Sequence, residues 1–418
     1  MTPAARLQMA IEILETMATT EQPVDRLLKD WFRTRRFAGS KDRAAIAERV
    51  FTIQRHRAAL AWRMRSETPR ALVIASLLAE GAMPETWFTG DGYGPALLSD
   101  DEKAAIAVEP APAPLPVLGG FPAFLEPELT SVFGPRLLDE MLALQQRAPI
   151  DLRVNTLRRE RGEVLDALIA QGFAAKPTPF APHGIRIASG EGSAALGRGA
   201  MFESGAFEFQ DEAAQIASIL CRARPDSRIL DLAAGAGGKS LALAALMRNQ
   251  GEIVASDIRQ PALQELAVRA KRAGATNIKT HLLTDAYPPT GLFDTVLLDT
   301  PCSGSGTWRR QPELRWRTTP ARLAELVPLQ DRLLAQAAAF VKPGGRLVYA
   351  TCSILPRENE ARVATFLSRN PAFKLHRADA AWRESTKGEP PPGLGEFFRA
   401  SPFSTGTDGF FTAVLLRE

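Results

Sequence analysis

The sequence predicts an α/β protein whose second half folds as a doubly wound parallel sheet, preceded by an all-helical domain and a small α+β insert. From residue 207 to the end, short apolar stretches with strand character alternate with helical patterns. This alternation is typical of a parallel sheet that is covered by helices on both faces. In the first 80 residues, by contrast, apolar side chains recur at helical spacing. A chain of 418 residues has room for two or three domains, each with its own core.

The N-terminal part is expected to be a helical bundle. Ala71–Ala79 is apolar on all sides and predicts a buried helix, whereas two earlier segments each show a single apolar face. The apolar positions of these faces are Leu7, Ala10, Ile11, Leu14 and Met17, followed by Val24, Leu27, Leu28, Trp31 and Phe32. The proline-rich stretch 109–116 cannot continue a helix and predicts a semi-rigid linker. We therefore expect a helical domain at residues 1–120.

Residues 121–205 are expected to form a small α+β subdomain, and residues 206–418 the α/β domain. The subdomain should contain a strand at 151–157, a helix at 163–170 and a strand at 184–188. Six strands are predicted in the α/β domain, at Arg228–Leu232, Glu252–Asp257, Ile278–Leu283, Asp294–Asp299, Arg346–Ala350 and Phe410–Leu416. Residues 384–407 are rich in proline, glycine and serine and predict a long surface loop.

The composition is that of a globular protein. Hydrophobic residues make up 45% and charged residues 23% of the chain, which are usual values, and no stretch has the apolar length of a membrane span. The amphipathic N-terminus contains acidic residues and lacks the layout of a secretory signal. Three cysteines cannot form a disulfide framework. We expect a cytoplasmic protein that does not act at a membrane.

Basic residues crowd the segment 33–65. They are Arg33, Arg35, Arg36, Lys41, Arg43, Arg49, Arg55, Arg57, Arg63 and Arg65. A solvated helix face is the more common explanation of such a segment, and a patch that attracts phosphates is the alternative. The net charge of +4 is weak evidence for a nucleic-acid partner. From this segment alone the solvated face is slightly favoured.

A glycine loop, DLAAGAGGKS at residues 231–240, joins the first strand of the α/β domain to a helix near Lys239. Glycines let a ligand approach the backbone, and free N–H groups at a helix start favour anionic or polar groups. One interpretation is a phosphate-binding loop of the G-x-x-x-x-G-K-[ST] type, but the first glycine of that motif is replaced by Ala233. The other is a nucleoside site.

Acidic residues at successive strand ends favour the nucleoside site. Asp257 ends the second strand, where an acid accepts hydrogen bonds from ribose hydroxyls. Asp285 follows the third strand and could meet an adenine amino group, and Asp299 ends the fourth. Such a set of acids suits a cationic adenosyl ligand better than a triphosphate. S-adenosylmethionine, which carries a sulfonium and an ammonium, has this character.

Two of the three cysteines occupy the same kind of position. Cys302 lies in DTPCSGSGT directly after the strand that ends at Asp299, and Cys352 follows the next predicted strand. Chemistry in open α/β sheets sits beyond the carboxyl ends of the strands, so we expect the two thiols to work on one substrate. Burial in the core is the alternative for any free cysteine, and it is the expected fate of Cys221, at the end of an apolar helix.

Two tryptophans follow the first thiol in a cationic segment. Trp308 and Trp316 alternate with arginines in residues 307–317, a mixture that suits phosphate contacts and base stacking. Burial of both rings in a core is an equally good alternative. The four histidines, His56, His183, His281 and His376, are scattered and show no metal-ligand spacing. No metal is expected.

Together these motifs resemble those of the Nol/Nop/Sun family of RNA cytosine-C5 methyltransferases. The resemblance covers roughly residues 151–418, and its motifs are RVNTLR (153–158), FQDEAAQ (209–215), DLAAGAGGKS (231–240), SDI (256–258), DTPCSGSGT (299–307) and YATCS (349–353). It implies a Rossmann-like methyltransferase sheet that uses S-adenosylmethionine. The helical N-terminal part resembles the NusB-like RNA-binding domain of the bacterial RsmB-type branch, which acts on small-subunit ribosomal RNA.

The resemblance also implies roles for individual residues. Cys352 of the Thr-Cys motif would be the nucleophile, and Cys302 of the Pro-Cys motif would aid product release. The contacts to the methyl donor would be made by Ala233, Ala234, Gly235, Ala236, Gly237, Gly238, Lys239, Asp257, Asp285 and Asp299. The family loop usually reads C-A-A-P-G-G-K, so AAGAGGK lacks its cysteine and its proline. Thr300 replaces the usual alanine before Pro-Cys, a minor departure.

The chemistry of cytosine explains why two thiols are needed. C5 of the base is a poor nucleophile until a thiolate adds to C6, after which C5 can attack the methyl group. A carboxyl group at the N3 edge, for which Asp299 is placed, would stabilise the adduct. We expect RNA, most simply ribosomal RNA, as the partner of a monomer. A non-catalytic RNA-binding or assembly factor is the alternative, and a P-loop nucleoside triphosphatase ranks third.

Overall fold

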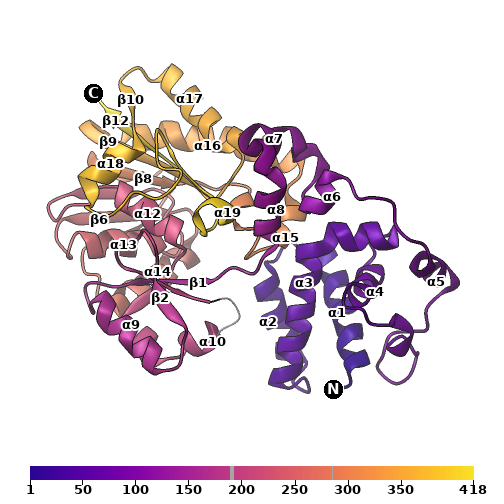
Figure 1. Cartoon of the computed structure of the whole chain (residues 1–418). Helices are drawn as coiled ribbons and strands as arrows, with labels where there is room; N and C mark the ends of the chain where they lie inside the picture. Colours follow the sequence, from indigo (N-terminus) through magenta and orange to yellow (C-terminus); the bar gives the residue numbers. More distant parts are fainter. Residues whose placement is uncertain (189–192, 285) are drawn as a thin grey trace. The chain divides into compact units, whose positions relative to one another are not determined.

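The computed structural model covers most of the chain, describing residues 1–188, 193–284 and 286–418. The chain divides into two compact units (Figure 1). The helical unit consists of Met1–Gln146 together with Trp308–Thr319, and the α/β unit consists of Arg147–Thr307 and Pro320–Glu418. The expected domain boundaries near residues 120 and 205 remain a prediction.

Helices make up the helical unit. They are α1 (Pro3–Ala18), α2 (Val24–Thr34), α3 (Ser40–Met64), α4 (Pro69–Ala79), α5 (Asp100–Ala107), α6 (Leu115–Gly119), α7 (Glu126–Phe133), α8 (Leu137–Gln145) and α15 (Glu313–Arg317), with 3-10 turns η1 (Pro84–Thr86), η2 (Ala123–Leu125) and η3 (Gly134–Arg136). Thr2 and Thr68 cap α1 and α4 by accepting backbone N–H bonds. The first four helices share one apolar core, and α4 is buried from Ala71 to Leu77, as its all-round apolar sequence predicts.

The α/β unit begins with a small antiparallel sheet in the order β2-β3-β1-β4. Its elements are β1 (Ile150–Val154), α9 (Arg161–Ala170), β2 (Ala175–Pro177), β3 (Gly184–Ile187), α10 (Ser193–Leu196), α11 (Ala200–Glu203) and β4 (Phe207–Phe209). The two predicted strands and the predicted helix of this region are confirmed as β1, β3 and α9. Buried apolar side chains of the strands and of α9 form its core.

Among the described residues the large sheet has eight strands, with β10-β12-β9-β8-β5-β6-β7 in order and β11 paired to β12. The strands are β5 (Arg228–Asp231), β6 (Glu252–Asp257), β7 (Ile278–Leu282), β8 (Phe293–Asp299), β9 (Val341–Thr351), β10 (Phe373–His376), β11 (Phe398–Ala400) and β12 (Phe410–Arg417). The helices and turns between them are α12 (Glu212–Leu220), α13 (Gly238–Leu246), α14 (Gln260–Ala273), η4 (Ser305–Thr307), α16 (Pro320–Ala339), η5 (Pro356–Glu358), α17 (Glu360–Arg369), α18 (Ala378–Ser385) and α19 (Pro402–Thr405).

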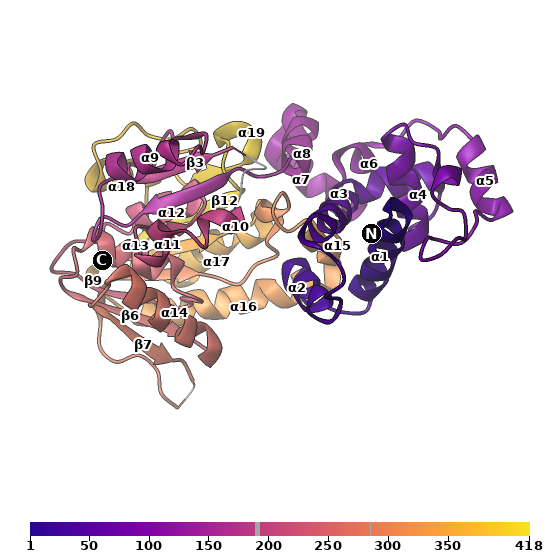
Figure 2. The same cartoon turned by 90° about the horizontal axis from the view of Figure 1, so that it is seen from below.

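Both faces of the large sheet are covered, which confirms the predicted Rossmann-like α/β class. Side chains alternate along a strand, so Val348 and Ala350 of β9 pack with α12, α13 and α18, while Leu347 and Tyr349 pack with α16 and α17. Helix α14 lies beside β6 and β7 at one edge of the sheet (Figure 2).

The structure corrects two expectations. The sheet is mixed rather than wholly parallel, because β12 pairs antiparallel with β9, and β10 and β11 pair antiparallel with β12. Apolar runs alone do not reveal strand direction. Residues 384–407 are not one long loop, since they contain β11 and α19. Phe398 and Ala400 of β11 are buried, but the surrounding Pro, Gly and Ser residues hid this short strand.

Candidate active site

The carboxyl ends of four neighbouring parallel strands bring the predicted site residues to one edge of the large sheet. Strands β6, β5, β8 and β9 pair in parallel register, so their ends lie side by side. These ends are Asp257, Asp231, Asp299 and Thr351. The glycine loop leaves β5, and the two cysteine-bearing segments leave β8 and β9. We call these segments, residues 300–306 and 351–355, the thiol loops.

The two thiols predicted to act together are neighbours. The sulfur atoms of Cys302 and Cys352 lie 3.4 Å apart, and both residues are half-buried. The backbone N–H of Gly306 donates to the carbonyl of Cys352 at 2.9 Å, which joins the two thiol loops. The hydrogen bond with Cys352, followed by burial and by the charges of Cys352 and Glu358, raises the pKa of the Cys302 thiol well above its usual value. Cys302 is therefore protonated at neutral pH.

The third cysteine is a core residue, as predicted. Cys221 follows α12, is fully buried, and packs among apolar side chains on one face of the sheet. Burial raises the pKa of its thiol to about 12. It plays no part in the geometry of the thiol loops and is a suitable site for a control substitution.

Lys239 of the glycine loop reaches the thiol region. Its ammonium pairs with a carboxylate oxygen of Asp299 at 2.5 Å and lies 5.2 Å from the ring centre of Phe410. Burial alone would lower the pKa of Lys239, but the charge and hydrogen bond of Asp299 outweigh it and raise the pKa, and the charge of Cys352 contributes in the same direction. The predicted donor-contacting lysine and the predicted N3-edge carboxylate thus form one ion pair near Cys352.

The glycine loop has a fixed backbone. Gly235 and Gly237 adopt left-handed conformations, with φ of 55° and 81°. A Cβ atom on Gly237 would lie 2.4 Å from the Leu266 side chain. Asp257 accepts the backbone N–H of Gly235 at 2.8 Å, and Arg269 donates to the carbonyl of Ala236 at 2.7 Å. These bonds hold the loop where the family pattern has a proline.

Asp257 is already engaged by its own neighbour. Arg259 donates to both oxygens of its carboxylate through its side chain at 3.0 and 3.1 Å, and its backbone N–H adds a third bond at 2.8 Å. Burial would raise the pKa of Asp257, but the hydrogen bonds from Arg259 and Gly235 outweigh it and lower the pKa. The side chain of Arg259 is 65% exposed, so it can turn into solvent at little cost.

Two residues of this edge need separate comment. The sequence offered no reason to select Ile258, and Asp285 cannot be compared with its prediction. Ile258, directly after Asp257, is 74% exposed, an unusual position for a large apolar side chain. It was named only as part of the SDI motif, and apolar patterning gave no reason to single it out. Asp285, the predicted adenine contact, lies outside the described residues.

Asp231 supplies a buried acceptor oxygen that has no partner in the described part of the chain. One carboxylate oxygen accepts the hydroxyl of Ser240 at 2.6 Å, whereas the other has no hydrogen-bond partner among the described residues. Burial, together with the charges of Asp299 and Asp257, raises the pKa of Asp231 to about 6. An unsatisfied buried carboxylate oxygen of this kind fits a cationic group of a ligand.

The tryptophans predicted as possible stacking platforms belong to the helical unit. Trp308 is fully buried, and the indole N–H of Trp316 donates to the carbonyl of Gln54 at 3.0 Å. Arg315 between them is also fully buried, and its guanidinium donates to the carbonyls of Arg55 and Leu144. The core interpretation is therefore the right one for Trp308.

Several arginines of the basic segment serve the helical unit itself. Arg49 pairs with Glu80 at 2.6 Å, and Arg57 pairs with Glu67 at 2.9 Å. Arg63 donates to three backbone carbonyls at the end of α5. These contacts occupy the guanidinium groups of Arg49, Arg57 and Arg63 within the fold. The choice between a solvated helix face and a phosphate-binding patch for the whole segment stays a prediction.

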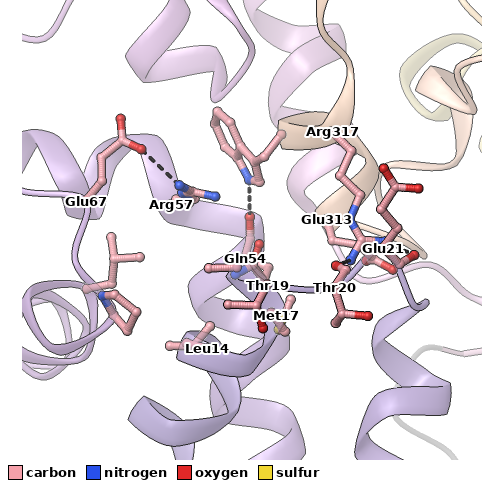
Figure 3. A pocket seen from close by; sticks show the side chains of 14 residues that line it. Leu14, Met17, Thr19, Thr20, Glu21, Gln54, Arg57, Glu67, Glu313 and Arg317 are labelled. Atoms are coloured by element: carbon pink, nitrogen blue, oxygen red, sulfur yellow. Dashed lines mark hydrogen bonds and ion pairs between the residues drawn. The ribbon is translucent and has the colours of Figure 1, made fainter. Parts of the chain in front are cut away.

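A cavity of about 530 Å³ lies in the helical unit at the end of α1 (Figure 3). Arg317 donates to the carbonyls of Thr20, Glu21 and Gln22, and the ion pair of Arg57 with Glu67 lies on the opposite side (Figure 3). Burial raises the pKa of Glu313, which accepts a backbone N–H of α2. Several polar groups of this wall are thus bonded to one another, although one carboxylate oxygen of Glu313 has no partner among the described residues. The lining contains neither Cys302 nor Cys352 nor a residue of the glycine loop.

No helix in residues 1–188, 193–284 or 286–418 is long and apolar enough to cross a membrane. Within the same ranges, no group of three or more His, Cys, Asp or Glu side chains could hold a metal ion. The expected lack of a metal stays a prediction.

Comparison with known protein families yields two matches along the chain. Residues 218–416 match the family described as 16S rRNA methyltransferase RsmB/F. Residues 121–192 match the ferredoxin-like domain of RsmF/B-like methyltransferases. The first match contains both thiol loops and the glycine loop.

Curated relatives carry the same designation. The chain is 36% identical over 300 residues to the probable ribosomal RNA small subunit methyltransferase B of Synechocystis, a match that covers 71% of this chain and 66% of that protein. It is 33% identical over 328 residues to the ribosomal RNA small subunit methyltransferase B of Sodalis glossinidius, covering 78% and 69%. The chain thus spans about two thirds of the length of these relatives.

Solved structures share the fold. The crystal structure of PH0851 is 26% identical, with a TM-score of 0.76 and 99% of both chains covered. NSun6 from Pyrococcus horikoshii, solved with SFG, is 21% identical, with a TM-score of 0.62 over 72% of this chain and 99% of that one. The second likeness concerns the fold alone.

Proposed function

The chain belongs to the RsmB/F family of 16S rRNA methyltransferases, and from this premise we propose that it transfers a methyl group from S-adenosylmethionine to C5 of a cytosine in small-subunit ribosomal RNA. The observation that carries this proposal is the pair of sulfur atoms, 3.4 Å apart, at the strand ends where Lys239 and Asp299 pair. A methyltransferase acting on a nitrogen or a hydroxyl oxygen has no need of two thiols.

The nucleophile is assigned to Cys352. Its thiolate adds to C6 of the base, and C5 becomes an enamine carbon that can attack an electrophilic methyl group. The ammonium of Lys239 is close enough to Cys352 for their charges to interact, so a cation stands near the sulfur during the attack. Asp299, held by Lys239, is assigned to the N3 edge of the base, where a hydrogen bond stabilises the adduct.

Release of the product is assigned to Cys302. After methyl transfer a water molecule takes the C5 proton, the electrons of the C5–H bond form the C5–C6 double bond, and the bond between C6 and the sulfur of Cys352 breaks with its electron pair on the sulfur. Cys302 is adjacent to the nucleophile and holds its proton at neutral pH because its pKa is raised. It is thus available to donate its proton, as a general acid, to the sulfur of Cys352 as that sulfur leaves C6.

The residues of the sheet edge fit S-adenosylmethionine. The donor supplies a methyl group on a positively charged sulfur. Asp257 is suited to the ribose hydroxyls and the exposed Ile258 to a face of adenine. The oxygen of Asp231 that has no partner among the described residues is suited to a cationic group. The backbone of residues 233–238 allows close approach because its glycines lack side chains. The fold relative NSun6 was solved with SFG, an analogue of this donor.

The other parts of the chain are assigned to RNA binding. Residues 121–192 match a domain that accompanies the catalytic domain in this family, and we assign to it contacts around the target base. The helical domain is assigned a NusB-like RNA-binding role. We further propose that the protein acts as a cytoplasmic monomer and needs no metal.

A direct assay tests this function. Protein, labelled methyl donor and unmodified 16S rRNA are incubated, and the RNA is digested to nucleosides. Label is expected in 5-methylcytidine for the natural chain and for Cys221→Ala, whose substitution lies in the core. It is expected to be absent for Cys352→Ala. Label in another nucleoside, or full activity of Cys352→Ala, contradicts the proposal.

A non-catalytic RNA-binding factor is the second candidate. The altered glycine loop and the engagement of Asp257 by Arg259 favour it. Calorimetry with the donor separates the two candidates, because such a factor would bind RNA but not S-adenosylmethionine. The ion pair of Lys239 with Asp299 and the family of the chain both count against the nucleoside triphosphatase.

A further inference from the structure

One buried carboxylate connects the two thiol loops. The side chain of Glu358 is fully buried at the end of the turn η5. Ser303, which follows Cys302, donates to it through its backbone N–H at 2.8 Å and through its hydroxyl at 2.5 Å. Ser353, which follows Cys352, donates to it through its hydroxyl at 2.5 Å. Each thiol is therefore one residue away from a bond to the same side chain.

The surrounding bonds fix the direction of these contacts. The hydroxyl of Ser303 accepts the backbone N–H of Ser305 at 3.3 Å, and the hydroxyl of Ser353 accepts that of Leu355 at 3.0 Å. Each hydroxyl accepts from the backbone and so directs its own proton to Glu358. The side-chain amide of Gln330 donates to Glu358 and to the carbonyl of Pro301, both at 3.0 Å. Four donors from three residues thus converge on one carboxylate.

We propose that Glu358 is a positioning residue that sets the separation of the two sulfur atoms and thereby lets both thiols act on one base. The inference rests on the proposed function, since the separation matters for catalysis only if both thiols serve the same reaction. The physical reason is the short path from anchor to sulfur. One residue separates each thiol from its bond to Glu358, so a change in the carboxylate is transmitted directly to the thiol loops.

The charge of Glu358 has a second effect. It is one of the causes that raise the pKa of Cys302, after the hydrogen bond with Cys352, burial and the charge of Cys352. Glu358 therefore helps to keep Cys302 protonated while the neighbouring sulfur attacks. Position and charge act together, because the side chain of Glu358 both holds the two thiol loops and raises the pKa of Cys302.

The test substitutes Glu358→Gln in a Cys221→Ala background, so that only the two site thiols remain. Glutamine keeps the shape, but its NH₂ group cannot accept the hydrogen bonds that a carboxylate oxygen accepts. Tyr349→Phe is the matched control. It removes a buried hydroxyl that donates to the backbone carbonyl of Glu358 at 2.6 Å and leaves the carboxylate contacts in place. Ser303→Ala removes a single hydroxyl donor and serves as a milder variant.

Three measurements are made on each variant: the melting temperature, kcat and KM for RNA methylation, and the rate of disulfide formation with diamide. Diamide takes one hydrogen from each thiol as the sulfur–sulfur bond forms, and the loss of two hydrogens is followed by mass. We expect Glu358→Gln to lower kcat by about 100-fold with KM values nearly unchanged, since small misplacements of reacting groups have effects of this size. We expect its disulfide to form about tenfold more slowly, because disulfide geometry is specific. Loss of the negative charge acts in the opposite direction by favouring the thiolate of Cys302, so the rates are compared over a series of pH values.

Ser303→Ala is expected to lower kcat by about tenfold. Tyr349→Phe is expected to change kcat and the rate of disulfide formation little, although its melting temperature falls about as much as that of Glu358→Gln. The proposal is overturned if Glu358→Gln keeps its kcat and forms the disulfide at the original rate, or if Tyr349→Phe loses as much activity as Glu358→Gln. If the parent chain does not methylate RNA, the proposed function fails, but the diamide rates still decide whether Glu358 sets the separation of the sulfurs.

Discussion

The thiol loops and the donor side of the candidate site differ in how their polar groups are satisfied. Around the thiols, the buried carboxylate of Glu358 receives hydrogen bonds from protein donors on both loops. On the donor side, Asp231 keeps a buried oxygen without a described partner, and Asp257 is held by the exposed Arg259. The carboxylate of Glu358 is satisfied by protein donors, although the Thr300 hydroxyl and the amide oxygen of Gln330 have no partner among the described residues. The donor side has the character of a region that a ligand completes. Geometry for bond making is thus preorganised, while binding energy is available for the donor.

The largest expected effect comes from the preorganised region. Cys302→Ala removes the thiol beside the nucleophile, and we expect covalent protein–RNA adduct to accumulate while turnover falls by on the order of 10³-fold or more. The reason is that Cys352 still attacks C6 but the bond to carbon is not broken efficiently. A gel under denaturing conditions detects the adduct, and Cys302→Ala combined with Cys352→Ala should show none. Normal turnover without adduct would remove Cys302 from the reaction.

The sequence was enough to predict where the two thiols lie, but not that Glu358 holds their loops. Cys302 and Cys352 could be paired because each follows a predicted strand of one sheet, and parallel strands end at one edge. Glu358 could not be found this way, since Ser303 is 55 residues away in sequence. Ser353 is only five residues away, but serines have many possible partners and this spacing alone indicates no bond. Knowing which loops converge requires the structure.

The same limit explains the errors elsewhere. Strand direction for β12 depends on pairing across the sheet, which apolar runs do not encode. The ring of Trp308 could not be assigned to a core or to a surface, because aromatic residues among arginines occur in both. Its burial is decided by the packing of residues 308–319 within the helical unit.

The next expected effect concerns pH and the unsatisfied acid on the donor side. The pKa of Asp231 is raised to about 6 in the folded chain from an ordinary value near 3.8. Between about pH 4 and 6 the folded state therefore keeps a proton that the unfolded state has lost, and stability falls as pH rises, by up to about 3 kcal/mol. Asp231→Asn should flatten this part of the stability curve in urea unfolding. If the free energy of unfolding changes with pH equally in both proteins, the pKa of Asp231 is not raised in the folded chain.

The affinity for the methyl donor is a second measurement of the ionisation of Asp231. If a cationic group of the donor is held by the ionised form of Asp231, donor affinity should increase as pH rises through 6 in the natural chain. Asp231→Asn should bind the donor weakly at every pH between 5 and 8. Calorimetry at several pH values separates this behaviour from a general loss of folding, which the urea experiment reports.

A smaller effect is expected from the backbone of the glycine loop. Gly237→Ala places a Cβ 2.4 Å from Leu266 in a left-handed conformation, and we expect it to destabilise the fold by about 2 kcal/mol. Gly238→Ala is the matched control, because its Cβ would meet nothing closer than 3.7 Å and alanine is the better helix former. Urea unfolding of both variants makes the comparison. Equal stability of the two would mean that the loop is not held in this conformation.

The smallest expected effect tests whether the donor side is as open as its exposed arginine indicates. Arg259→Ala removes the guanidinium that bonds Asp257, and a solvent-exposed pair of this kind contributes about 1 kcal/mol or less. Because a ribose would compete for the same oxygens, the substitution should leave donor affinity unchanged or tighten it by up to about fivefold. Arg269→Ala is the opposing case: it removes the bond to the carbonyl of Ala236 and the pair with buried Glu208, so it should weaken donor binding. If Arg259→Ala weakened binding as much as Arg269→Ala does, Arg259 would be part of the donor site, and the contrast between a preorganised thiol region and a ligand-completed donor region would lose its main support.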